Sequence, residues 1–202
     1  MATDENWFTT EAQFEMSVND LYRANLWKQL NEDWTDNEAY RNSLKAYVLG
    51  TVNGQTSEIT SMWADTYKVI GRGNAIMDKL KSAVKDRLVG EVSFARACMY
   101  LQLVTLFGDV PYSDTTIDIE TAFNMGRTPK AEVLEKVYAD FDEAIRLLPE
   151  KSGAVQRPTK GAALAMKARL ALYNEDWDKV IGATSECMKL GYELYSDYEE
   201  LF

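Results

Sequence analysis

Apolar residues recur along most of this chain at intervals of three and four positions, the spacing of one face of an α-helix. Few prolines interrupt this pattern, which predicts an all-α protein. Helices are expected from a capping box at 10–13 onward and over 57–80, 91–107, 129–148, 159–174 and 176–190. In the helix over 57–80, Trp63, Tyr67 and Ile70 are expected on the buried face.

The stretch 91–107 is apolar nearly all round, which is typical of a central helix contacted on several sides. Arg96 lies inside it and needs a partner, because an unpaired buried charge is very costly. Asp109 is expected to be that partner. Gly108 follows the helix at the position where a left-handed residue commonly ends one.

Two long segments, 25–56 and 108–128, lack a clear period and are expected to be loop-rich insertions. Loops longer than about 12–15 residues are uncommon in compact domains and are often functional. The second segment is expected to end where Thr128 caps the next helix and Pro129 forms its first residue.

The later helices form an irregular repeat. Residues 137–147 align with 180–190 at an offset of 43 residues, whereas tetratricopeptide repeats have a period of about 34. Small residues such as Ala168 and Ala171 fit the tetratricopeptide pattern, but Glu175 stands where that pattern prefers glycine. The sequence therefore predicts helix pairs of tetratricopeptide-like type, stacked as a short solenoid with long irregular loops.

The stretch 27–42 mixes flat aromatic rings with short polar side chains. Sugar binding needs this mixture, because rings stack on the C–H faces of a pyranose while hydroxyl groups need directed donors and acceptors. The alternative is that the rings plug a helical surface, since aromatic side chains are mostly buried. The candidate ligand-binding residues are Trp27, Trp34, Asp36, Tyr40, Arg41 and Asn42.

Charge and composition exclude several functions. The formal net charge of −10 at pH 7 disfavours nucleic-acid binding. The chain has no histidine, which excludes His-based catalysis and most zinc sites. Paired carboxylates lie on predicted helices and are interpreted as solvated faces rather than as glycosidase acids. No catalytic residue, metal site or cofactor is expected.

The two cysteines and the chain start leave alternatives open. Cys98 and Cys187 are expected to be buried thiols, with a disulfide as the alternative. No signal peptide begins at Met1, so the protein is either cytoplasmic or has lost a leader. The apolar run 94–107 is shorter than the ~20 residues that a membrane-spanning helix needs.

Several segments follow one another in an order typical of one family. The most diagnostic runs from Leu103 to Tyr112 and is preceded by Arg96. Further matching segments are 127–133, 142–149, 159–173, 176–177 and 198–202, preceded by a helix with Trp63, Tyr67, Ile70 and Asn74. The chain resembles, from about residue 63 onward, the SusD/RagB family of outer-membrane nutrient-binding proteins.

The resemblance implies a lipid-anchored surface protein of Bacteroidota-type bacteria with a SusD-like fold and no enzymatic activity. Such a protein captures oligosaccharides or related nutrients and passes them to a TonB-dependent, SusC-like transporter. The alternative is a tetratricopeptide-type scaffold that binds only protein partners, and a hydrolase ranks third.

Two departures from the family qualify this interpretation. The lipid-bearing cysteine is absent, and family members are usually more than twice this length. Residues 1–202 are therefore interpreted as the N-terminal helical domain of a longer protein. The apolar tail 191–202 does not resemble the polar cap of a solenoid end, so an exposed apolar patch is expected there.

Overall fold

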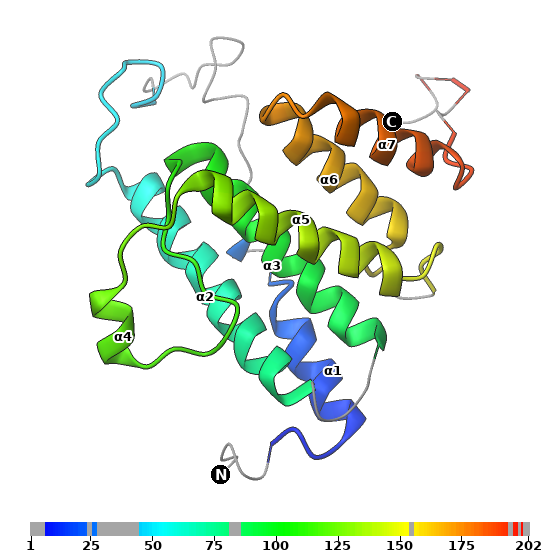
Figure 1. The fold of residues 1–202 in the computed structure, drawn as a ribbon, viewed down its shortest axis with the longest axis horizontal. Helices are drawn as coiled ribbons and strands as arrows, with labels where there is room; N and C mark the ends of the chain where they lie inside the picture. The colour runs from blue at the N-terminus through cyan, green and yellow to red at the C-terminus, as the bar shows by residue number, and fades with distance from the viewer. Residues whose placement is uncertain are drawn as a thin grey trace. The chain divides into compact units, whose positions relative to one another are not determined.

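The computed structural model of the protein describes residues 7–23, 26–27, 45–80, 86–153, 156–193, 196–197 and 199. Its helices are α1 (Glu11–Asp20), α2 (Ser57–Leu80), α3 (Asp86–Phe107), α4 (Ile119–Asn124), α5 (Lys130–Leu147), α6 (Lys160–Tyr173) and α7 (Trp177–Met188) (Figure 1). An antiparallel bridge between Val110 and Thr128 is the only β pairing among these described residues. The predicted all-α class is confirmed.

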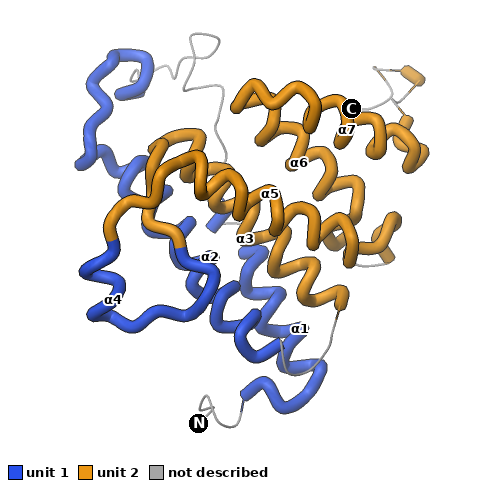
Figure 2. Tube along the Cα trace, in the orientation of Figure 1, with its two compact units in different colours: residues 1–82, 113–125 blue, residues 83–112, 126–202 orange. Residues whose placement is uncertain are grey.

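The chain divides into two compact units (Figure 2). Unit 1 comprises Met1–Ser82 and Ser113–Met125, and unit 2 comprises Ala83–Tyr112 and Gly126–Phe202. Unit 1 therefore contains α1, α2 and α4, whereas unit 2 contains α3, α5, α6 and α7. The connection between α3 and α5 begins and ends in unit 2, while its middle belongs to unit 1.

In unit 1, α1 packs on α2. The predicted capping box opens α1: the Gln13 N–H donates to the Thr10 hydroxyl, and the Gln13 side-chain oxygen accepts from the Thr10 N–H. At the other end of α1, Asp20 forms an ion pair with Arg72 of α2, with 2.7 Å between Oδ2 and Nη1. These contacts fix both ends of the short helix.

The buried face of α2 is rotated by one position from the predicted one. Ile70 is buried as expected, but Trp63 and Tyr67 are only half-buried, with their ring centroids 5.0 Å apart. The buried stripe of α2 includes Met62, Thr66, Val69, Gly73, Ile76 and Leu80. Two aromatic rings thus lie at the border of the core rather than inside it.

In unit 2, α3 is the central element, and every residue over 90–101 is buried. Both α5 and α6 contact α3. The approach of α5 requires a glycine, because a Cβ at Gly90 would lie 2.9 Å from the Cβ of Leu147. The buried carboxylate of Glu91 is paired with Arg157, with 2.8 Å between Oε2 and Nη1.

The remaining helices of unit 2 stack in chain order, because α5 packs on α6 and α6 packs on α7. The predicted stacking of helix pairs is confirmed. As expected for a close helix approach, Ala168 and Ala171 of α6 are buried. Leu164 and Ala168 pack with Ala183 of α7, and Ile145 of α5 covers this cluster.

Left-handed residues end two helices of unit 2. Gly108, with φ of +70°, follows α3 as predicted. Glu175, with φ of +57°, occupies the turn between α6 and α7. The backbone closes this turn by a bond from the Asp176 N–H to the Ala171 carbonyl, 3.0 Å long. A residue with a Cβ is strained in this conformation by roughly 1–2 kcal/mol.

We expect Glu175→Gly to raise the free energy of unfolding by about 0.5–1 kcal/mol, because the relief of strain exceeds the entropy that glycine adds to the unfolded chain. Urea denaturation measures this change. As a matched control, Glu135→Gly on the exposed side of α5 is expected to lower the same quantity by about 1 kcal/mol. A destabilising effect at both positions would show that Glu175 is not strained.

Candidate functional site

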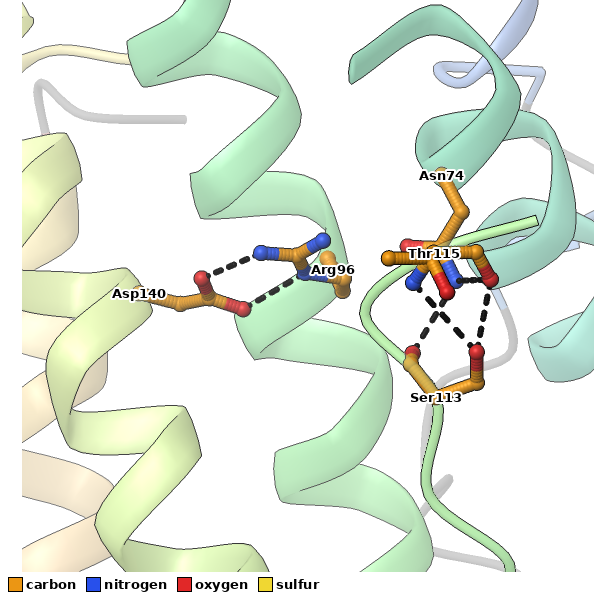
Figure 3. Close-up of polar contacts among 5 residues, drawn as sticks. All are labelled: Asn74, Arg96, Ser113, Thr115 and Asp140. Carbon is orange, nitrogen blue, oxygen red and sulfur yellow. Dashed lines mark hydrogen bonds and ion pairs between the residues drawn. The ribbon is translucent and has the colours of Figure 1, made fainter. Parts of the chain in front are cut away.

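Arg96 lies at the centre of α3 and forms a buried bidentate ion pair with Asp140 of α5 (Figure 3). Its Nε donates to Oδ2 at 2.7 Å and its Nη2 to Oδ1 at 2.6 Å. The prediction that Asp109 is the partner is therefore wrong. One sequence signal identifies Asp140: it lies between Val137 and Phe141 on the buried stripe of α5, where a carboxylate needs a partner.

Asp109 instead caps α5. Its Oδ1 accepts a hydrogen bond from the Lys130 N–H at 2.8 Å, and negative charge is favourable at a helix N-terminus. The helix begins at Lys130 with Pro129 as its N-cap, so the predicted start, with Thr128 as cap, is wrong. Thr128 is in an extended pairing with Val110, which removes its backbone from the position that a cap requires.

The same pairing closes the base of the segment 108–128. The Val110 N–H donates to the Thr128 carbonyl at 3.2 Å, and the Thr128 N–H donates to the Val110 carbonyl at 3.0 Å. Val110 is fully buried. Close by, the ring of Tyr112 packs on Tyr100 of α3, with centroids 4.7 Å apart. The diagnostic segment that ends at Tyr112 therefore has a structural role: it fixes where this loop starts and ends.

The middle of this segment is held by α2 within unit 1 (Figure 3). The buried Asn74 amide donates to the carbonyls of Ser113 at 3.0 Å and of Thr115 at 3.1 Å. One turn further along α2, the Asp78 carboxylate accepts from the Thr116 N–H at 3.0 Å. The sequence analysis missed these roles of Asn74 and Asp78. A buried amide within an apolar stripe is the signal that points to Asn74.

The segment held in this way carries α4, and none of the residues of α4 is buried. Ile119 is 76% exposed and Phe123, one turn later, is 86% exposed. Asp118 caps the helix by accepting from the Thr121 N–H at 2.7 Å. This backbone hydrogen bond lowers the pKa of the Asp118 carboxyl group. The predicted insertion 108–128 thus contains a short exposed helix.

Of the candidate ligand-binding residues, Trp27 lies within the described residues. Its indole N–H donates to the Leu21 carbonyl at 2.6 Å. Its ring is half-buried and stacks on Tyr22, with centroids 6.1 Å apart and an interplanar angle of 22°. Trp27 thus anchors the chain to the end of α1. The other candidates, which lie outside the described residues, are Trp34, Asp36, Tyr40, Arg41 and Asn42.

The perturbed ionisable groups in the described part of the chain have structural causes. Burial raises the pKa of the Cys98 thiol, and the hydrogen bond from Lys179 lowers the pKa of the Asp176 carboxyl group. Cys98 and Cys187 are free thiols, which excludes the disulfide alternative. The described residues contain no group of three or more Cys, Asp and Glu side chains that could hold a metal ion.

None of the helices in the described ranges is both long and apolar enough to cross a membrane.

Residues 2–172 match a family of SusD-like proteins described as starch-binding and associating with the outer membrane. The chain is 27% identical to SusD-like protein P2 of Formosa agariphila, over 98% of this chain and 44% of that protein. Its fold is similar to the crystal structure of a SusD-like protein from Bacteroides fragilis, with a TM-score of 0.82, 27% identity, and coverage of 95% of this chain and 40% of that one.

A second structure from Bacteroides fragilis, a SusD-like carbohydrate-binding protein, gives a TM-score of 0.84 at 24% identity, over 96% of this chain and 44% of that one. At this identity the likeness concerns the fold. The chain spans less than half the length of each of these three relatives.

We expect Asp140→Ala to lower the free energy of unfolding by about 3–5 kcal/mol, because the buried guanidinium of Arg96 loses its carboxylate. The double variant Arg96→Met, Asp140→Leu should lose much less, since it removes both buried charges. Urea denaturation of the three proteins gives the comparison.

The control for this experiment is Glu143→Ala, which breaks the exposed ion pair with Arg146, 2.6 Å between Oε1 and Nη2. Its expected cost is below about 1 kcal/mol. Equal losses in Asp140→Ala and Glu143→Ala would contradict the central role of the buried pair.

Asn74→Ala should release the segment 113–116 from α2, because two carbonyls lose their amide donor. The expected loss is about 1–3 kcal/mol, accompanied by faster proteolytic cleavage within 113–125. Asn124→Ala is the control, since the Asn124 amide bonds only locally to the Glu120 carbonyl at 2.9 Å. Unchanged cleavage in Asn74→Ala would show that Asn74 does not hold the loop.

Proposed function

The chain belongs to the SusD-like family of starch-binding proteins that associate with the outer membrane, and from this premise we propose that the full-length protein captures oligosaccharides at the cell surface. The observation that carries the proposal is the family match over residues 2–172. The capture involves binding alone, without chemical conversion of the sugar. The captured oligosaccharide then passes to a TonB-dependent, SusC-like transporter.

The roles of the motif residues support a division of labour within the chain. Arg96, Asp109 and Asn74 each form hydrogen bonds to the protein itself, at Asp140, Lys130 and the 113–115 carbonyls. Polar groups used in this way hold the helices and the loop in place. Ligand contacts are therefore proposed for the aromatic stretch 27–42, which lies outside the diagnostic motifs.

Within that stretch we assign different roles to the two tryptophans. Trp27 has one ring face on Tyr22 and its N–H on the Leu21 carbonyl, so its role is to anchor the stretch to α1. Trp34 is followed by Thr35 and Asp36, polar neighbours that suit an exposed stacking platform. Asp36, Tyr40, Arg41 and Asn42 would supply hydrogen bonds to sugar hydroxyls.

Anchoring in the outer membrane is part of the same proposal. The family description places its members in association with that membrane, and a lipid anchor on the full-length protein would hold the binding site at the surface. The net charge of −10 opposes adhesion to anionic lipid headgroups. A specific anchor, rather than charge, would therefore keep the protein in place.

The test uses the full-length protein and maltoheptaose, because the family is described as starch-binding. We expect a dissociation constant in the micromolar range or weaker, since shallow polar sites gain little net free energy. Trp34→Ala should raise it by about tenfold or more through loss of ring stacking, while the helix content by circular dichroism stays unchanged. Isothermal titration calorimetry measures the binding.

Phe123→Ala is the matched control, because Phe123 is another aromatic residue, is 86% exposed and lies outside the aromatic stretch. It should bind maltoheptaose like the wild type. An equal loss of thermal stability and binding in Trp34→Ala would identify Trp34 as a packing residue. Shorter sugars appearing in the maltoheptaose sample would contradict binding without conversion. Failure of a wider glycan panel would favour the protein-binding scaffold.

A further inference from the structure

The outer side of α7 carries an exposed apolar stripe. Trp177, Ile181 and Met188 are 57%, 64% and 79% exposed. Spacings of four and seven residues place these side chains in one row along the helix. A row of this kind is the ridge that a neighbouring helix normally contacts, so its exposure requires an explanation.

The stripe is separate from the side of α7 that already packs on α6. The packed side consists of the buried Ala183 with the half-buried Val180 and Cys187. At about 100° per residue, the stripe lies roughly a third of a turn away from these positions. The apolar surface of α7 therefore extends over two adjacent sides, as in a helix that contacts two neighbours rather than one.

The end of this helical stack also lacks a polar cap. Solenoids of stacked helix pairs need a terminal unit with a polar outer face. In α7 the charged side chains lie beside the stripe and form local pairs, Lys179 with Asp176 and Lys189 with Glu186. The stripe itself contains no charged residue, and interfaces that are permanently buried are depleted of charge in the same way.

We propose that this stripe on α7 is covered by a helix from the polypeptide that follows residue 202 in the full-length protein. The matched relatives provide the length, since the chain accounts for 44% of the Formosa agariphila protein and 40% of the first Bacteroides fragilis structure. A segment of the same polypeptide is favoured over a separate partner because the stripe continues the helix-on-helix stacking of α5, α6 and α7. The proposal rests on family membership and on α7, and glycan binding has no part in it.

The test is hydroxyl-radical footprinting of the wild-type full-length protein. Met188 should be oxidised at least tenfold more slowly than Met16 of α1, although Met16, at 52%, is the less exposed of the two in the present structure. In a second measurement, Ile181→Glu should lower the melting temperature of the full-length protein by several degrees, because it buries a charge. Ile119→Glu on the exposed α4 is the matched control and should leave the melting temperature unchanged.

Two results would overturn the proposal. The first is oxidation of Met188 as fast as that of Met16, together with an Ile181→Glu variant as stable as Ile119→Glu. The second is protection of Met188 that disappears on dilution as a dimer dissociates, which would identify a second copy as the occupant. Footprinting needs no variant, so the proposal can be tested even if Ile181→Glu does not fold. Loss of maltoheptaose binding in Trp34→Ala would bear on neither result.

Discussion

The burial of α3 on all sides is the constraint on which the rest of unit 2 depends. A helix whose residues 90–101 are all buried has to neutralise each ionic group it contains, because the cost of an uncompensated buried charge approaches the whole stability of a domain. Arg96 therefore fixes the rotation of α5 by requiring Asp140 beside it, and Glu91 requires Arg157. Gly90 sets how closely α5 approaches. Apolar burial provides the driving force for this packing, and the ion pairs select one register for it.

The connection between α3 and α5 extends this constraint to the surface. Gly108, Asp109 and the Val110–Thr128 pairing direct the chain away from one helix and into the next. Asn74 then holds the middle of the connection through backbone carbonyls, which are present whatever the side chains there. The residues between these points are free to vary without loss of the loop. This explains how the most recognisable motif of the chain is structural while exposed residues such as Phe123 project from it.

Features governed by local geometry could be predicted from the sequence, and those governed by packing register could not. The cap at Thr159, the left-handed Gly108 and the central burial of α3 follow from a few neighbouring residues. The partner of Arg96 does not, because Asp109 and Asp140 are both plausible until the rotation of α5 is known. Of the candidate ligand residues, Trp27 alone lies in the described part of the chain, where its bonds to α1 set it apart from the more polar surroundings of Trp34.

The spacing of exposed aromatic and aliphatic residues separates two kinds of surface in this chain. Trp177, Ile181 and Met188 follow a helical ridge and lack charged residues among them, which suits burial against another helix. The stretch 27–42 has no such period and alternates its rings with amides and carboxylates, which suits a ligand whose surface alternates C–H faces with hydroxyls. A packing surface needs regular complementarity along an axis, whereas a sugar site needs a few rings with directed polar groups between them. The same residue types therefore predict different partners according to the order in which the chain presents them.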